Sequence, residues 1–122
     1  MMNALEKISG ANAKDCLVSD TLVSFLVNEK DVGRAIGKKA STVKALEENF
    51  RKRVEIIGFQ ENAEEMVKKA LGIEFNGAKK TPEKIVIRLD SINKKKMMKK
   101  NAKFKRVKEF VKRNFGTELV IG

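Results

Sequence analysis

One stretch of this sequence decides how the rest is interpreted: Val32-Gly33-Arg34-Ala35-Ile36-Gly37-Lys38-Lys39-Ala40-Ser41-Thr42-Val43. It predicts a tight turn between two short helices. Gly37 has no Cβ, so a sugar-phosphate backbone can approach its main chain closely. Lys38 and Lys39 are expected to project toward phosphates, and the N–H groups that begin the next helix favour anions. Ser41 is expected to be the N-cap of that helix and a hydrogen-bond donor to phosphate.

The sequence around this turn predicts an alternation of helices and strands. Leu22 to Val27 is nearly all apolar, which is typical of a strand buried on both faces. Val43, Leu46 and Phe50 recur at i, i+3 and i+7, which predicts a helix. In the first half we expect a helix at 4–8, strands at 15–19 and 22–28, a helical turn at 31–37, a helix at 41–50 and a strand at 54–59.

The second half repeats this order. We expect a helix at 61–71, a strand that begins at 73–75 before the turn signal Asn76-Gly77, a strand at 85–89, a helix at 101–115 ended by Gly116, and a strand at 118–121. At an offset of 61 residues, the apolar helical face of Val43, Leu46 and Phe50 meets that of Phe104, Val107 and Val111. We expect the order helix, strand, strand, helix, helix, strand in both halves, with the helix before residue 101 left without bounds in the second. It predicts an internal duplication, an α+β fold, and domains at 1–60 and 61–122.

The first turn resembles the loop of the KH domain, whose pattern reads I-G-x-x-G-x-x-I. This chain has Ile36-Gly37-Lys38-Lys39-Ala40-Ser41-Thr42-Val43, and the preceding Val32-Gly33-Arg34-Ala35 is similar to a phrase of the NusA-type KH pair. The resemblance covers essentially the whole chain. It implies two tandem type II KH units (αββααβ), each a three-stranded sheet with helices packed on one face. A short chain with only this pair looks like the archaeal NusA-like transcription factors.

The resemblance also implies an RNA site at the loop of the first unit. Ala40 stands where the pattern has its last glycine, and we expect its methyl group to weaken RNA binding without abolishing it. The corresponding stretch of the second unit, Met98-Lys99-Lys100-Asn101, has neither glycine. The candidate RNA-binding residues of the first unit are Arg34, Ile36, Gly37, Lys38, Lys39, Ala40, Ser41 and Lys44. Those of the second unit are basic side chains expected to contact phosphates without sequence preference: Lys99, Lys100, Lys103 and Arg106.

The charge of the chain favours a polyanionic partner. Among its 122 residues, 27 are Lys or Arg and 16 are Asp or Glu, a net charge of +11. Residues 1–60 hold 10 basic and 8 acidic residues, whereas residues 61–122 hold 17 and 8. A solvated lysine surface is the other interpretation of such a charge run. The concentration in one half and the nearly single sign over residues 94–113 favour nucleic acid.

Several classes of activity are excluded by what the sequence lacks. Without His, it has no His-based acid–base catalysis and no His-ligated metal. The single Cys16 lies in an apolar run and is expected to be a buried structural thiol. There is no signal-peptide pattern, and no apolar run reaches the about 18 residues of a membrane span. We therefore expect a cytoplasmic, non-enzymatic monomer with no cofactor, no metal and no membrane contact.

Three functions fit these residues. The NusA resemblance implies that the chain binds single-stranded RNA in transcription elongation or termination, with RNA polymerase as a partner reached through that RNA. A ribosome-associated or rRNA-maturation protein can also contain KH units, and copurification with ribosomal subunits would indicate it. A protein-interaction adaptor with residual RNA affinity would instead bind a protein partner in a salt-insensitive way.

Overall fold

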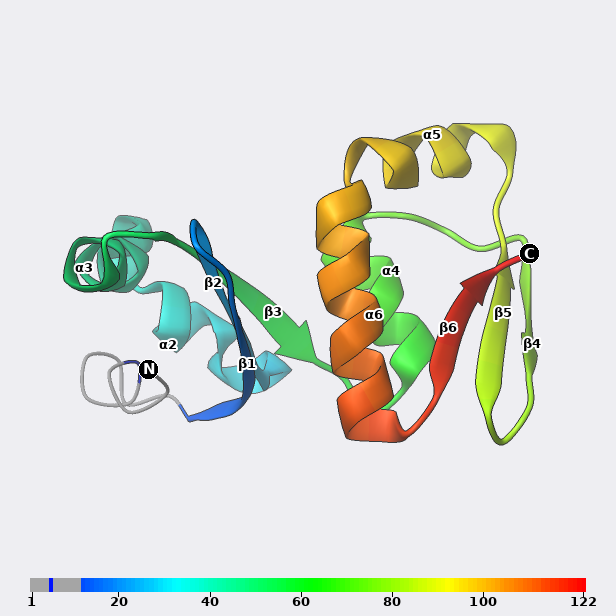
Figure 1. Cartoon of the computed structure of the whole chain (residues 1–122), viewed down its shortest axis with the longest axis horizontal. Helices are drawn as coiled ribbons and strands as arrows, with labels where there is room; N and C mark the ends of the chain where they lie inside the picture. Colours follow the sequence, from blue (N-terminus) through cyan, green and yellow to red (C-terminus); the bar gives the residue numbers. More distant parts are fainter. Residues whose placement is uncertain (1–4, 6–11) are drawn as a thin grey trace. The chain divides into compact units, whose positions relative to one another are not determined.

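The computed structural model describes residue 5 and residues 12–122. The chain divides into two compact units, Met1–Gln60 and Glu61–Gly122 (Figure 1). The helix expected at 4–8 falls outside the described residues except for Leu5, which is helical and fully buried. None of the helices in the described part is long and apolar enough to cross a membrane.

The first unit is built on a mixed three-stranded sheet. Its strands are β1 (Ala13–Val18), β2 (Leu22–Asn28) and β3 (Arg53–Phe59). Its helical segments are the 3₁₀ turn η1 (Glu29–Asp31), α2 (Val32–Ile36), the 3₁₀ turn η2 (Lys38–Ala40) and α3 (Ser41–Phe50). In the sheet order β1-β2-β3, β1 is antiparallel and β3 parallel to β2. The parallel pair requires a crossover between its strands, and the segment from η1 to α3 supplies it.

The core of the first unit lies between this sheet and its helices. Six fully buried side chains form it: Leu5, Val23, Phe25, Val27, Ala35 and Leu46. The side chains that alternate with them on β2, Ser24 and Leu26, are fully buried as well. Burial of β2 on both faces is therefore confirmed, as its nearly all-apolar sequence predicted. Cys16 is half-buried and packs against this core.

The second unit repeats the plan of the first. Its strands are β4 (Gly77–Lys80), β5 (Lys84–Arg88) and β6 (Glu118–Ile121), and its helices are α4 (Ala63–Leu71), α5 (Ser91–Lys99) and α6 (Asn101–Phe115). β4 is antiparallel and β6 parallel to β5. α6 packs against α4 and β6, and α5 lies at one end of the unit, where it leads into α6 (Figure 1). The expected α+β class with two three-stranded units is confirmed.

The two units share the same hairpin turn. In the first, the N–H and Oγ of Ser19 donate to the Leu22 carbonyl at 2.8 and 3.3 Å, and Ser19 Oγ accepts from the Leu22 N–H at 3.1 Å. In the second, Thr81 makes the same three hydrogen bonds with Lys84, at 2.9, 3.2 and 3.1 Å. Because a serine and a threonine build one turn in two places, the hairpin supports an internal duplication.

A uniform offset of 61 residues between the halves is nevertheless wrong. The two hairpin turns are 62 residues apart, from Ser19 to Thr81. The left-handed residues that end α3 and α6, Arg51 and Gly116, are 65 residues apart. Helices α3 and α6 begin 60 residues apart and end 65 apart, because α6 has 15 residues and α3 has 10. The apolar faces of the two helices still match at an offset of 61, because 61 and 65 differ by four residues, which is close to one helical turn.

The strand expected to begin at 73–75 is not there. The N–H of Ile73 donates to the Lys68 carbonyl at 3.2 Å, at the end of α4. The N–H of Glu74 donates to Asn93 Oδ1 at 3.0 Å, in α5. Both backbone groups therefore bond to the helices of the unit, and neither is left for a strand partner.

The turn signal Asn76-Gly77 does not mark the hairpin. The hairpin turn lies at 81–84, and Gly77 already pairs with Arg88 as the first residue of β4. Gly77 has a φ of 159°, which is nearly extended backbone. Here the glycine begins a strand, and the turn is made by the Thr81 side chain.

Candidate nucleic-acid interface

The loop between α2 and α3 has an unusual backbone. Gly37 has a φ of 78°, and Lys39 and Ala40 have φ of 51° and 59°. Two consecutive non-glycine residues in the left-handed region are uncommon, because the Cβ of each approaches the following carbonyl oxygen. The KH pattern has a glycine at position 40, and glycine adopts this geometry without steric conflict.

Gly37 is required by the fold as well as by its expected ligand. A Cβ at this position would lie 2.5 Å from Thr42 Oγ1 and 2.8 Å from both Ser41 Oγ and the Thr42 nitrogen. Its positive φ is also a value that L side chains rarely adopt. The sequence suggested that this glycine admits a sugar-phosphate backbone. The structure adds a second reason, which is that the start of α3 packs against its Cα.

Helix α3 begins without a side-chain cap. Its N-cap is the left-handed Ala40, and no side chain accepts a hydrogen bond at this end. The expectation that Ser41 is the N-cap is wrong, because Ser41 is already the first helical residue, where it is exposed. The first N–H groups of a helix have no intrahelical partner and attract anions. With Lys38 and Lys39 exposed beside them, the loop offers cations and an uncapped helix end to one ligand.

The other candidates of the first unit flank this loop. Arg34 lies in α2 with 60% of its side chain exposed, and its guanidinium is 3.4 Å from Asp31 Oδ1. Ile36 ends α2 directly before the loop and is half-buried, whereas Lys44 is exposed in the first turns of α3. All eight candidates therefore lie between Arg34 and Lys44, on α2, on α3 or in the loop between them. Helices α2 and α3 pack against each other, which holds the two sides of this loop together.

The corresponding junction of the second unit has a different backbone. Only Lys100, with a φ of −113°, separates the end of α5 from the start of α6. None of residues 98–101 is in the left-handed region. The Nζ of Lys100 donates to the Leu71 carbonyl at 3.1 Å, at the C-terminal end of α4. Helix C-termini favour cations, so this ammonium group already has a structural partner within the unit.

The remaining candidates of the second unit do not form a loop with Lys100. Lys99 is the exposed last residue of α5. Lys103 and Arg106 are half-buried and lie about one turn apart on α6. The structure therefore gathers the first-unit candidates around one backbone feature and leaves those of the second unit distributed over two helices.

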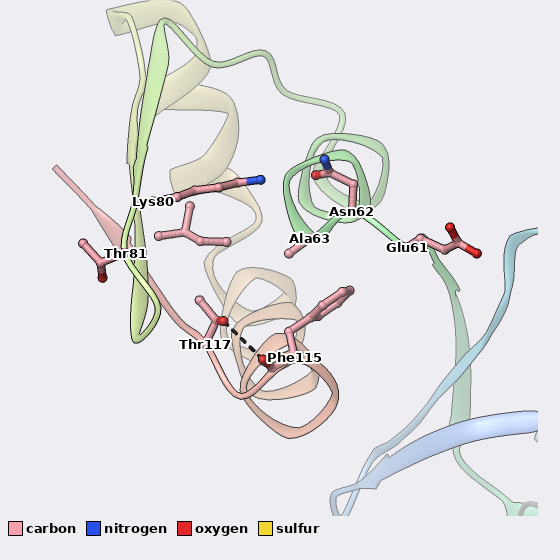
Figure 2. A pocket seen from close by; sticks show the side chains of 8 residues that line it. Glu61, Asn62, Ala63, Lys80, Thr81, Phe115 and Thr117 are labelled. Atoms are coloured by element: carbon pink, nitrogen blue, oxygen red, sulfur yellow. Dashed lines mark hydrogen bonds between the residues drawn. The ribbon is translucent and has the colours of Figure 1, made fainter.

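A hollow of about 380 Å³ lies in the second unit, and Figure 2 shows it from close by. The start of α4, the hairpin and the end of α6 surround it. Lys80 points across it, as Figure 2 shows, and its Nζ lies 2.9 Å from Glu64 Oε1. Asn62 caps α4 by accepting from the N–H groups of Glu64 and Glu65. The start of α4 is thus already capped, in contrast to α3, and no sequence-predicted site residue lines this hollow.

Comparison with known proteins links the chain to one family. The KH domain family matches residues 2–97. The "Probable transcription termination protein NusA" of Methanocaldococcus jannaschii is 46% identical over 57 residues, which are 47% of this chain and 31% of that protein. The protein of the same name from Halococcus morrhuae is 42% identical over 66 residues, or 54% of this chain and 48% of that protein.

A protein of the same name from Methanococcus vannielii is 34% identical over 67 residues. These residues are 55% of this chain and 39% of that protein. The chain therefore spans less than half the length of these curated relatives, and the homology with archaeal NusA covers about half of the chain. Among solved structures, the crystal structure of APE1850 matches with a TM-score of 0.82 and 26% identity. That match covers 99% of this chain and 94% of the other.

Proposed function

The chain belongs to the KH-domain family, and from this premise we propose that it binds single-stranded RNA through the loop between α2 and α3. KH domains clamp about four nucleotides of RNA backbone with a GxxG loop. In this proposal, residues 1–60 are a KH domain whose GxxG loop is nearly intact, with Ala40 in place of the last glycine. Residues 61–122 are a second KH domain with a degenerate loop, which contributes basic side chains.

One observation carries the proposal. Two exposed lysines, Lys38 and Lys39, stand beside a helix N-terminus that no side chain caps. A phosphate bound there would accept hydrogen bonds from backbone N–H groups and from the ammonium groups together. Gly37 keeps the approach to this end of α3 free of a Cβ.

The biological role that we propose is transcription elongation or termination. It is supported by the names of the relatives, which are probable transcription termination proteins. Nascent RNA is then the ligand, and RNA polymerase is a partner that the chain reaches through this RNA. Since KH domains are recognition modules for nucleic acid, the proposal includes no catalytic step.

A titration with a short fluorescent single-stranded RNA tests this function. The variant Lys38→Gln/Lys39→Gln removes two cations from the loop, and Lys30→Gln/Lys79→Gln removes two exposed lysines from elsewhere. Each phosphate contact on single-stranded nucleic acid contributes about 0.7 to the slope of log affinity against log salt. We expect the loop variant to bind RNA more weakly and to have a slope that is shallower by about 1.4. The control should stay close to wild type.

The alternatives predict other outcomes of the same titration. If the wild-type chain has no RNA affinity at any salt concentration, the RNA-binding function is refuted and a protein-interaction adaptor is favoured. If both variants weaken binding equally, the loop is not the site. Copurification with ribosomal subunits instead of RNA polymerase would replace the proposed role in transcription by one in rRNA maturation.

A further inference from the structure

Helix α6 and the start of β6 line a second hollow, which none of the individually named candidate residues lines. Its volume is about 390 Å³, within the range of small-ligand sites. Three lysines and two glutamates line it: Lys105, Lys108, Glu109, Lys112 and Glu118. Three ammonium groups at one hollow indicate an anionic ligand, and the two carboxylates restrict what kind of anion it can be.

The three lysines share one side of α6. An α-helix turns about 100° per residue, so Lys112 lies within about 20° of Lys105, and Lys108 within about 60°. Lys103 and Arg106, the candidates chosen from the sequence, point roughly 160° and 100° away from Lys105. The hollow therefore uses a different set of cations from the one that the KH pattern indicated.

The charges of the hollow are only weakly compensated by the protein. Lys105 and Lys112 have no carboxylate partner within the described part of the chain, and Lys108 Nζ lies 4.0 Å from Glu118 Oε1. Glu109 is paired with Arg113, whose Nε lies 3.2 Å from its Oε1. Glu118 is 60% exposed, and its carboxylate is farther from its cationic partner than that of Glu109, at 4.0 Å against 3.2 Å. The lysines and one carboxylate are thus available to a ligand.

We propose that this hollow binds the ribose-phosphate backbone of RNA, with the three lysines on phosphates and Glu118 accepting a hydrogen bond from a 2′-hydroxyl. A bare phosphate would be repelled by the carboxylates, whereas a ribose-phosphate presents an anion and a hydroxyl donor side by side. The 2′-hydroxyl is also the group that distinguishes RNA from DNA. This inference rests on the proposed RNA-binding function and adds a second contact surface and an RNA preference to it.

Removal of the three lysines tests the phosphate contacts. Lys105→Gln/Lys108→Gln/Lys112→Gln is compared with Lys79→Gln/Lys84→Gln/Arg88→Gln, which removes three exposed basic side chains from β4 and β5 of the same unit. The loss of three phosphate contacts makes the slope of log affinity against log salt shallower by about 2, which corresponds to roughly 50-fold weaker RNA binding at 0.15 M salt. The control is expected to change that slope by less than one contact. Equal effects in the two variants would overturn the proposal.

Glu118→Ala tests the hydroxyl contact. With single-stranded RNA and DNA of the same base sequence, we expect the RNA-to-DNA affinity ratio to fall about tenfold, the size of one hydrogen bond to a charged group. An unchanged ratio would refute the role of Glu118. Tripolyphosphate is the third probe, and if it competes at the hollow as strongly as the RNA does, the site is a general anion site.

Failure of the α6 hollow as an RNA contact can be distinguished from failure of the proposed RNA-binding function. If the loop variant loses RNA binding and the α6 variant does not, the function stands and the hollow is refuted. If the wild-type chain binds no RNA, the function itself fails. Circular dichroism and thermal unfolding of each variant show that a loss of binding is not a loss of fold.

Discussion

Replacement of Ala40 by glycine is expected to stabilise the protein, which is the opposite of what this substitution does in most helices. Ala40 is the left-handed N-cap of α3, with φ 59° and ψ 29°. Glycine at this position would restore the I-G-x-x-G pattern and remove the Cβ that conflicts with the backbone. The prediction therefore links the strained geometry of the loop to the one departure from the KH pattern.

The magnitude follows from two opposing terms. A non-glycine residue in the left-handed region costs about 1–2 kcal/mol. Glycine loses more backbone freedom on folding, which costs about 0.4–1 kcal/mol relative to alanine. The net gain in the free energy of unfolding for Ala40→Gly is about 0.5–1 kcal/mol. Ala45→Gly is the matched control, because Ala45 is exposed within α3, and there glycine costs about 1 kcal/mol.

Urea denaturation of the two variants measures this difference. We expect the unfolding free energies of Ala40→Gly and Ala45→Gly to lie on opposite sides of wild type and to differ by about 1.5–2 kcal/mol. RNA affinity of the Ala40 variant should rise, since the backbone can then approach without a methyl group. Equal destabilisation by both substitutions would refute the left-handed geometry at position 40 and the reasoning built on it.

Three further substitutions are expected to act on stability. Gly37→Ala should destabilise the first unit by at least about 1–2 kcal/mol in thermal unfolding, because the new Cβ meets Thr42 at a positive φ; a wild-type melting temperature would contradict the packing. Lys100→Met removes the hydrogen bond to Leu71 and should cost about 1 kcal/mol, whereas Lys99→Met should stay within about 0.5 kcal/mol of wild type, and equal effects would rule out the structural role. Asp90 caps α5, and the hydrogen bond from the Asn93 N–H lowers its pKa below the ordinary 3.8. The stability from this cap is therefore present above the ordinary pKa of 3.8 and lost as the pH falls through the lowered pKa. Asp90→Asn keeps a cap acceptor that does not titrate, so its acid unfolding should lack this component, and a curve identical to wild type would contradict the cap.

Where apolar periodicity was strong, the sequence predicted the fold closely. The strands at 22–28 and 118–121 and the helices at 41–50 and 101–115 occur with the expected limits. Helix α5 (Ser91–Lys99) was not delimited, because Ile92, Met97 and Met98 are its only apolar residues and only Met97 is buried. Its start depends on the Asp90 cap, which is a local hydrogen bond and not a pattern of apolar residues.

The candidate loop between α2 and α3 could be located from sequence, but its backbone could not. Glycine and lysine spacing pointed to 37–40, yet nothing in the sequence showed that Lys39 and Ala40 are both left-handed. The role of Lys100 depends on Leu71, which lies 29 residues earlier in the chain and meets it only in the folded unit. The α6 hollow was missed for a similar reason, because Glu118 belongs to a different element from the three lysines.

An NMR titration of the isotopically labelled chain with a short single-stranded RNA tests directly whether the loop between α2 and α3 is the RNA site. If the loop between α2 and α3 is the RNA site, the backbone amide signals of residues 37–44 shift at the lowest RNA concentrations, and those shifts persist at moderate salt. A role of this loop in RNA binding is contradicted if these signals stay in place while only signals of residues 91–115 shift and then return as salt is added. In that case the affinity of the chain belongs to its lysine-rich second half, and the loop between α2 and α3 is part of the scaffold.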